Sequence, residues 1–532
     1  MPSPLPSTAP SAAAPLPDLA GHMFRSLLRN IAITGMAYAA ISLVGLLLAP
    51  VFIASFGLSG YGQILLARVF LPSAAFGLLD LGVGENTTRI VASARAHNQW
   101  GQAGRGIGLI LMIALAMSAI AGTALALLAP QIAAWMSIAD TEQAGFVVVL
   151  LATASVLPVL FLSLVAEGVL KGFEAFKKLR SCEVVSAVSY ASMSLVAIGL
   201  GKGPNVMSLA LLAGLIIRTA MATWWAWGLL RKQGFRLHRA DAATQQDILA
   251  WSGTMLFSKL IGTVQTQVQN PLLGILVGPT AVGMFDAIVR LPRFVKSIFS
   301  LISATVMPMA ARLRAQEDHE ATRRLARTGM LGAFIVCTPP AVMAGIYSYS
   351  ILDAWMGQRV ATFWVWQAAM FVVPVVNVVT SFGSSILLSD RVAAISLNRL
   401  SFVQVVLQIG LSLALLPWLQ PWSVALGQIV SVLLLIPFQL RLIRRHLGLE
   451  GGMGWRMILA TAASAAIGTT MYLIIPRPDL LALLALLATG SVLGWLAAPF
   501  VAMDRTSRQQ FFALLGQRLR PKFGELDRKI GP

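Results

Sequence analysis

Four charged residues lie within an apolar stretch, residues 281–310, that is long enough to cross a bilayer: Asp286, Arg290, Arg293 and Lys296. At about 100° per residue, a helix places all four within an arc of about 120°, so one face is charged and the rest is apolar. Each cation facing lipid at a helix centre would cost roughly 2.5 to 3.5 kcal/mol. The pattern favours a face that lines a cationic, water-filled cavity. The alternative is a structural cluster in which Asp286 pairs with Arg290, four residues away.

Three further basic residues lie inside apolar spans: Arg68, Arg218 and Lys259. A helical rise of about 1.5 Å per residue places Arg218, Lys259 and Lys296 near the bilayer midplane, with Arg68 nearer the outside. Cations at this depth, with few acidic residues to match them, fit an anionic cargo such as a diphosphate, which arginine binds through two parallel hydrogen bonds. Structural pairing of the same side chains is the alternative.

The span that carries Lys259 also carries hydrogen-bonding side chains close to the same helical face: Thr263, Thr266, Gln269 and Asn270. Such groups suit sugar hydroxyls, which both donate and accept hydrogen bonds. Polar side chains of these types also hold neighbouring helices together in membrane bundles. The sequence leaves these two interpretations open, so the four residues are candidates for a polar cavity lining.

Acidic residues in or near the spans are few: Asp80, Glu167, Glu183 and Asp286. The first three lie close to the cytoplasmic ends of their spans, where a solvated or capping role is expected. Asp286 is the candidate for proton or sodium coupling, unless it only neutralises Arg290. No catalytic residue, metal-ligand cluster or cofactor motif is recognised, and no Walker A pattern predicts ATP hydrolysis, so we expect a transporter rather than an enzyme.

The composition, 57% hydrophobic and 11% charged residues, predicts an all-α polytopic membrane protein. The net charge of +19 does not indicate nucleic-acid binding, because the basic residues are spread over many short loops. Cys182 and Cys337 lie at or within apolar segments, so neither a disulfide framework nor a zinc site is expected. The first 20 residues contain six prolines and no Lys or Arg, which predicts a disordered tail over residues 1–24 rather than a signal peptide.

Apolar runs of spanning length predict fourteen transmembrane helices. They lie at about 31–56, 61–83, 106–130, 146–170, 182–200, 206–230, 248–270, 281–310, 329–351, 362–389, 396–417, 422–440, 456–476 and 480–503. One side of the membrane carries 31 basic residues in loops and termini, and the other carries only Lys202, Arg359 and Arg477. Because positively charged loops stay in the cytoplasm, both termini are expected there.

The chain also repeats itself. Gly57, Gly62, Arg68 and Arg89 recur as Gly278, Gly283, Arg290 and Arg312, at offsets of 221 to 223 residues. The expected organisation is a six-helix bundle over 25–231, a cytoplasmic linker over 232–247 and a second six-helix bundle over 248–446. An additional helix pair at 447–503 and a basic tail at 504–532 follow. Each half has an even helix count, so the two bundles are a parallel, pseudo-symmetric repeat.

Sequence motifs in both halves resemble a known transporter family. The first half reads FGLSGYGQILLARVF and then LLDLGVGENTTR, and the second reads LLGILVGPTAVGMFDAIVRLP and then VMPMAARL, with ILDAWMG at 351–357. In this order and spacing, over about residues 25–445, they resemble the polysaccharide-transporter branch of the multidrug/oligosaccharidyl-lipid/polysaccharide (MOP) exporter superfamily, the Wzx-type flippases. The resemblance implies a MATE-like fold and no cofactor.

The same resemblance implies a cargo of undecaprenyl-diphosphate-linked oligosaccharide, moved across the bacterial inner membrane for O-antigen or exopolysaccharide synthesis. Implied partners are membrane lipids and, for the pathway, a polysaccharide polymerase and a chain-length partner, with a monomeric transport unit. A flippase for the peptidoglycan precursor and a multidrug antiporter are alternatives, although organic cations would require an anionic cavity. A membrane glycosyltransferase or polymerase is expected to have a large outer loop or a carboxylate-rich site, and the outer loops here are short.

Overall fold

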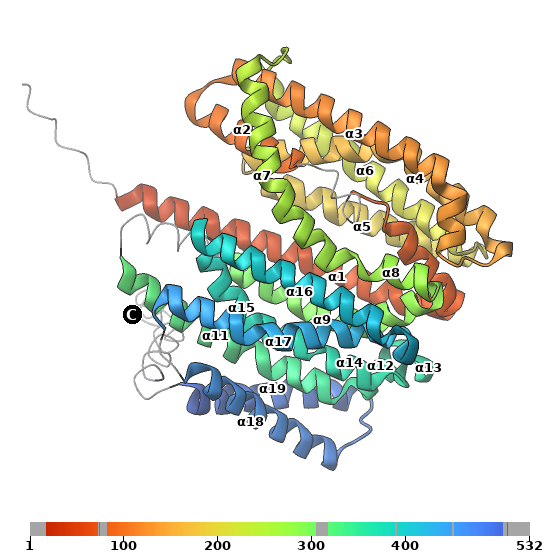
Figure 1. Ribbon diagram of the computed structural model, residues 1–532, viewed down its shortest axis with the longest axis vertical. Coiled ribbons are helices and arrows are strands. Elements are labelled where there is room, and N and C mark those ends of the chain that lie inside the picture. Colours follow the sequence, from red (N-terminus) through yellow and green to blue (C-terminus); the bar gives the residue numbers. More distant parts are fainter. Residues whose placement is uncertain are drawn as a thin grey trace, which may run out of the picture.

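The computed structural model describes residues 17–72, 74, 82–304, 318–388, 391–449, 452–503 and 508. Within these ranges the side chains of 17–32, 243, 249–259, 298–304, 391 and 453 are not described. All regular secondary structure in the described ranges is helical (Figure 1). Eleven of these helices are long and apolar enough to cross a membrane. The all-α polytopic class is therefore confirmed, whereas the count of fourteen spans is not.

The N-terminal half forms a group of long helices that pack side by side (Figure 1). Its buried core includes Leu150, Phe161 and Leu179, and this core continues to Phe285 and Ile288 of the C-terminal half. The helices are α1 (Pro17–Arg68), α2 (Val83–His97), α3 (Trp100–Trp135), α4 (Asp140–Gly172), α5 (Phe176–Gly199) and α6 (Pro204–Arg231).

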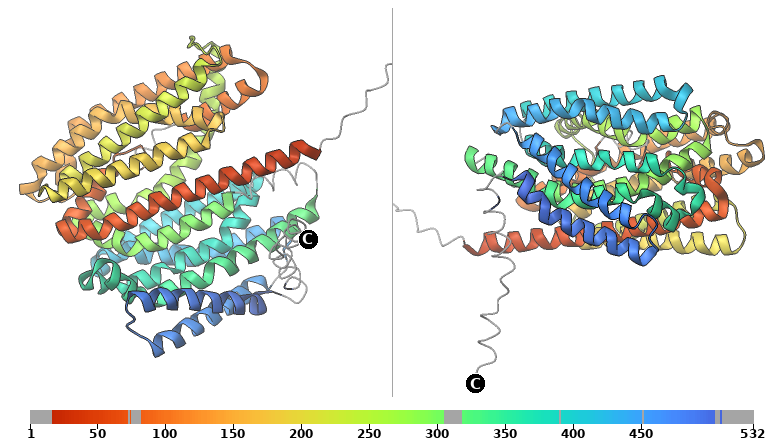
Figure 2. Two further views of the ribbon diagram at one scale, coloured as in Figure 1. Left: turned by 180° about the vertical axis from the view of Figure 1, so that it is seen from behind. Right: turned by 90° about the horizontal axis from the view of Figure 1, so that it is seen from below.

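The C-terminal half has a second core, which includes Met330, Phe334, Ile386 and Ile443. Figure 2 shows the last two helices at the edge of the molecule, and they pack against α11. The helices are α7 (Ala242–Gln267), α8 (Gln269–Leu276), α9 (Pro279–Ala304), α11 (His319–Ile346), α12 (Ser348–Met356), α13 (Gln358–Ala361), α14 (Trp364–Met370), α15 (Val372–Leu387), α16 (Arg391–Leu419), α17 (Trp422–Leu447), α18 (Met453–Ile474) and α19 (Leu480–Ala502).

The first predicted spans differ from the structure. Helix α1 begins at Pro17, inside the predicted tail, and continues past a kink at Gly57 to Arg68. Turns and a bend at residues 69–72 then end it, so the predicted span 61–83 is not one helix. Pro72 explains this end, because proline disfavours a helical conformation in the residue before it. The predicted linker 232–247 is also shorter, because α7 begins at Ala242 with Asp241 as its N-cap.

The sequence repeat is visible in the backbone. Gly57 and Gly278, 221 residues apart, both have positive φ, 67° and 107°, which glycine adopts without steric cost. At each repeat a glycine lets α1 and α9 approach closely. A Cβ on Gly62 would lie 1.8 Å from the carbonyl oxygen of Pro279, and one on Gly283 would lie 2.2 Å from that of Leu58. The two halves therefore meet in a near-symmetric backbone contact, at what we term the glycine end.

Adding a methyl group at this contact is expected to separate the two halves. In Gly62→Ala the new Cβ meets backbone atoms, which cannot rotate away, so α1 and α9 must move apart. A cysteine introduced at Val282, which is fully buried, should then react with a membrane-impermeant thiol reagent several times faster than in the parent. Gly35→Ala on the same helix has open space around it and serves as the control. Equal labelling in Gly62→Ala and the parent would show that the contact does not hold this end closed.

Helix α7 connects the two halves at the opposite end. Figure 1 shows it starting beside α2 and α3 and crossing to α8, near α16. Exposed ion pairs join its start to the N-terminal half, with Arg89 Nη2 2.6 Å from Asp247 Oδ2 and Arg105 Nη1 3.8 Å from Asp241 Oδ2. Hydrogen bonds from Thr244 lower the pKa of Asp241, which keeps this carboxylate ionised. The far end of α7 lies next to α8 and α16 of the C-terminal half.

Candidate functional site: a cationic cluster on helix α9

Asp286 is the centre of the charged face of α9. It is 5% exposed, and its carboxylate accepts four hydrogen bonds. Oδ2 accepts from Tyr61 Oη at 2.5 Å and from Arg290 Nε and Nη2 at 2.9 and 2.7 Å, while Oδ1 accepts from Arg293 Nη1 at 3.2 Å. The carboxylate therefore joins α1 to α9 and is shared by two arginines.

Arg290 is held from both helices. Besides Asp286, its Nη1 donates to the carbonyl oxygen of Gly45 in α1 at 2.7 Å, and its guanidinium lies 5.5 Å from the centre of the Tyr61 ring. The side chain is 17% exposed. The pairing of Asp286 with Arg290, which the sequence left as an alternative, is present. Arg290 therefore contributes to the contact between the halves as well as to the local charge.

Arg293 and Lys296 carry the charge that Asp286 does not neutralise. Arg293 Nη2 donates to Gln269 Oε1 at 2.8 Å, and its side chain is still 40% exposed although it lies in the middle of α9. Lys296, one turn further, has no hydrogen bond or ion pair within the described part of the chain. Three cations face one carboxylate, so this face has a formal excess of two positive charges.

Arg68 lies next to this cluster, at the end of α1. Its Nη2 donates to Tyr190 Oη of α5 at 2.6 Å, and its guanidinium lies 5.2 Å from the centre of the Tyr190 ring. The Nε of Arg68 is buried without a hydrogen bond. A phenol adds no negative charge beside the guanidinium of Arg68, so this side chain is suited to an incoming anion.

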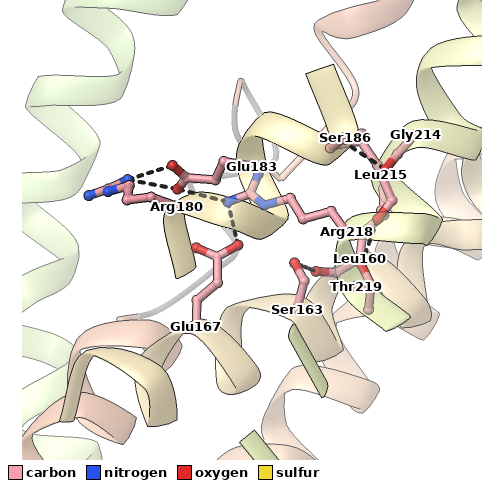
Figure 3. Close-up of polar contacts among 10 residues, drawn as sticks. All are labelled: Leu160, Ser163, Glu167, Arg180, Glu183, Ser186, Gly214, Leu215, Arg218 and Thr219. Atoms are coloured by element: carbon pink, nitrogen blue, oxygen red, sulfur yellow. Dashed lines mark hydrogen bonds and ion pairs between the residues drawn. The ribbon is translucent and has the colours of Figure 1, made fainter. Parts of the chain in front are cut away.

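Arg218 lies in a separate network inside the N-terminal half (Figure 3). Its Nη2 is 2.5 Å from Glu167 Oε1 and 3.6 Å from Glu183 Oε1, and Glu183 also pairs with Arg180 at 2.6 Å. The solvated role expected for Glu167 and Glu183 is therefore wrong, because both acids are largely buried and paired with arginines. Two acids and two bases balance, so this network has no excess charge with which to bind an anion.

The predicted polar lining is only partly assembled. Gln269 is 3% exposed and links Arg293 to Gln428, whose Oε1 accepts from Gln269 Nε2 at 3.0 Å. The hydroxyl of Thr266 donates to its own helix, at the carbonyl of Gly262, and the Oδ1 of Asn270 is buried without a partner. Thr263 is half-buried. The side chain of Lys259 and residue Asp80 lie outside the described residues.

Sequence reasoning missed polar residues that complete the surroundings of Lys296. Helices α7, α16 and α17 bring Gln265, Gln404, Gln408 and Gln428 to a small pocket shared with Gln269 and Lys296. Gln404 and Gln408 are spaced i, i+4 in an otherwise apolar helix, which places them on one face. That spacing is the signal in the sequence that could have identified them.

A model of the family described as "Polysaccharide biosynthesis protein" matches residues 27–314, more than half of the chain. The chain belongs to this family. The match includes both halves of the repeat contact and all of α9, so the cationic cluster lies inside the region that defines the family. A search of curated protein sequences finds no significant match.

Solved structures similar to this polysaccharide biosynthesis protein are transporters. "Lipid II flippase MurJ, inward closed conformation" aligns with a TM-score of 0.67 at 12% identity, covering 88% of this chain and 98% of that one. An inward-facing "multidrug resistance MATE family transporter of the MOP superfamily" aligns with a TM-score of 0.59 at 14% identity, covering 78% and 94%. A MATE structure in the bent conformation aligns at 0.54 and 14% identity, covering 82% and 96%. These structures and the family model confirm the resemblance and the MOP fold.

Proposed function

We propose that this protein is a flippase that moves undecaprenyl-diphosphate-linked oligosaccharide repeat units across the bacterial inner membrane for surface polysaccharide synthesis. The observation that carries the proposal is the excess of positive charge on α9 within a chain of the polysaccharide biosynthesis family. The charge on Arg293 and Lys296 that Asp286 does not neutralise favours a mobile anion, because uncompensated charge is costly even at partly buried positions. A diphosphate supplies that charge.

The cargo diphosphate is proposed to bind Arg293 first. Arg293 has two of its five N–H groups engaged, with Asp286 and Gln269, and is the most exposed arginine of the cluster. Two further cations are proposed to complete the anion site. They are Arg68 and Lys259, the latter from the same stretch of the sequence as Gln269. Arg290 acts as a positioning residue, because its donors are committed to Asp286 and Gly45.

Transport is proposed to follow alternating access of the two halves around this site. The glycine end is closed by the contacts of Gly62 with Pro279 and of Gly283 with Leu58, so cargo enters from the opposite, basic end. Separation of α1 from α9 at the glycine end then opens the exit route for the cargo at that end. Tyr61 and Arg290 bridge α1 and α9 beside the proposed cargo site. Binding of an anion at Arg293 can therefore alter the contact between these two helices.

A peptidoglycan-precursor flippase is the second candidate, and the similarity to the lipid II flippase MurJ favours it. Both cargoes would present a diphosphate to the same cations. Deleting the gene and analysing lipid-linked sugars separates the two. Accumulation of an undecaprenyl-linked oligosaccharide repeat, with normal peptidoglycan precursor levels, supports the first candidate, and accumulation of the peptidoglycan precursor alone would replace it with the second. Accumulation of neither contradicts a flippase function.

The proposed orientation has its own test. Both termini and the 440–455 loop, which carries Arg441, Arg444 and Arg445, are expected in the cytoplasm, because basic loops are retained there. An alkaline phosphatase fused after Arg445 should be inactive, and the same reporter placed after Arg477, in the turn between α18 and α19, should be active. Activity in the first fusion and none in the second would reverse the topology and place cargo entry on the other side.

A further inference from the structure

A small polar pocket lies inside the C-terminal half, beside Lys296 of the cationic face of α9. Its volume is about 40 Å³, and its polar lining includes five glutamines and one lysine: Gln265, Gln269, Gln404, Gln408, Gln428 and Lys296. A cavity measured in this way needs roughly 10 to 15 Å³ for one water molecule. The pocket therefore has room for a few waters or one compact ion, and it is too small for a sugar ring.

The hydrogen bonds of the lining residues are incomplete. Gln404 and Gln408 are 7% and 3% exposed, yet no described residue forms a hydrogen bond with either side chain. The side-chain oxygen of Gln269 accepts from Arg293, and its amide nitrogen donates to the side-chain oxygen of Gln428. The amide nitrogen of Gln428 is therefore available to a molecule in the pocket. Buried amides without partners indicate a site that something else fills.

The positive charge of the pocket favours an anion over a cation as its occupant. Lys296 has no ion-pair partner within the described part of the chain, and no acidic residue is among the pocket's lining residues there. Asp286, the nearby carboxylate on α9, already accepts from Tyr61, Arg290 and Arg293. A fixed ammonium repels metal cations, whereas an ammonium and several amide N–H groups together form a set of donors for an anion.

We propose that this pocket binds one compact monoanion, held by Lys296 and by the amide nitrogens of Gln404, Gln408 and Gln428. The anion offsets part of the positive charge of α9 that Asp286 leaves. Two sources share this chemistry: a free ion of the size of chloride, and the carboxylate of an acidic sugar on the cargo. The first source is independent of the proposed transport function, and the second rests on it.

The test uses the purified full-length protein without any cargo. Thermal unfolding is followed while sodium chloride or sodium acetate replaces a bulky sulfonate, 2-(N-morpholino)ethanesulfonate, at constant ionic strength. We expect saturable stabilisation by at least one of the two small anions. A response to chloride assigns the site to a free ion, and a response to acetate alone assigns it to a carboxylate. Stabilisation by neither would overturn the proposal.

Variants locate the effect in the pocket. Lys296→Met keeps the length of the side chain without its charge and should weaken the anion response at least tenfold, since charge-assisted hydrogen bonds are the strong ones. Gln408→Leu should weaken it by about 2- to 10-fold, and it tests the proposal separately if Lys296→Met does not fold. Lys202→Met, in an exposed loop, is the matched control and should respond as the parent does. An undiminished response in both pocket variants would place the anion elsewhere and refute the assignment.

Discussion

Arg293→Gln is expected to cut polysaccharide export and to leave lipid-linked repeats on the cytoplasmic leaflet. Arg293 is the arginine of the α9 face with the most exposed side chain, and it shares its carboxylate with Arg290. Loss of one charge-assisted hydrogen-bonding group should weaken cargo binding by roughly 10- to 150-fold, corresponding to about 1.5 to 3 kcal/mol. The measurement is the amount of exported polymer per cell, together with the amount of lipid-linked repeat.

Two companion variants separate charge from geometry. Arg293→Lys keeps the charge but loses the planar fork that binds two phosphate oxygens, so its export should be intermediate. Lys259→Gln should reduce polysaccharide export as Arg293→Gln does if Lys259 contributes to the same site. Arg359→Gln, in the short helix α13, and Arg477→Gln, in the turn between α18 and α19, remove exposed charges outside the proposed cargo site and should export normally. Parental export in both Arg293→Gln and Lys259→Gln, at normal expression, would mean that the cations are structural and that the cargo site lies elsewhere.

The charged face of α9 could be predicted from the sequence because it depends on one helix. Spacing alone places Asp286, Arg290, Arg293 and Lys296 on a common side, and the structure brings Asp286, Arg290 and Arg293 into direct contact. The repeat could also be predicted, since residues of the same type recur at a nearly constant offset, and two of them, Gly57 and Gly278, take positive φ values that favour glycine. Both features are local, and local geometry follows from residue type and spacing.

Features that depend on packing between distant helices could not be predicted in this way. The partner of Glu167 is Arg218, 51 residues away, and the partner of Asp286 on α1 is Tyr61, 225 residues away. The position of Glu167 near a helix end suggested solvent, but neighbouring helices cover it. Gln404 and Gln408 belong to the same class, because an uncharged amide in an apolar helix gives no sign of which pocket it faces. The interior polar contacts are set by the fold, not by any one span.

Asp286→Asn is expected to destabilise the protein more than any other single change in the cluster. It leaves Arg290 without a carboxylate at a 17% exposed position, and breaking a buried ion pair by removing one partner costs about 3 to 5 kcal/mol. It also weakens the bridge between Tyr61 and α9. The free energy of unfolding in detergent, from denaturant titration, measures the loss. Tyr61→Phe, which removes only the hydroxyl, should cost less.

The double variant, Asp286→Asn with Arg290→Gln, decides between pairing and ion coupling. If Asp286 serves to neutralise Arg290, removing both charges should recover most of the lost stability and part of the transport activity, because no unpaired charge remains. If Asp286 exchanges a proton during transport, the double variant should fold well but transport without dependence on the proton gradient. The four hydrogen bonds from Tyr61, Arg290 and Arg293 favour the first result, because they hold the carboxylate in direct contact with its structural partners.

The matched control is the same cycle at the buried pair of the N-terminal half, Glu167→Gln with Arg218→Gln. That pair should show a similar coupling in stability, since it too is a largely buried acid paired with an arginine, although here the two residues lie on different helices, α4 and α6. It should show no effect on cargo affinity beyond its effect on folding, because its network carries no excess charge. Loss of cargo affinity in well-folded Arg218→Gln would extend the anion site into the N-terminal half. Failure of the Asp286 double variant to recover stability would show that Arg293 and Tyr61, rather than Arg290, are the partners for which the carboxylate is required.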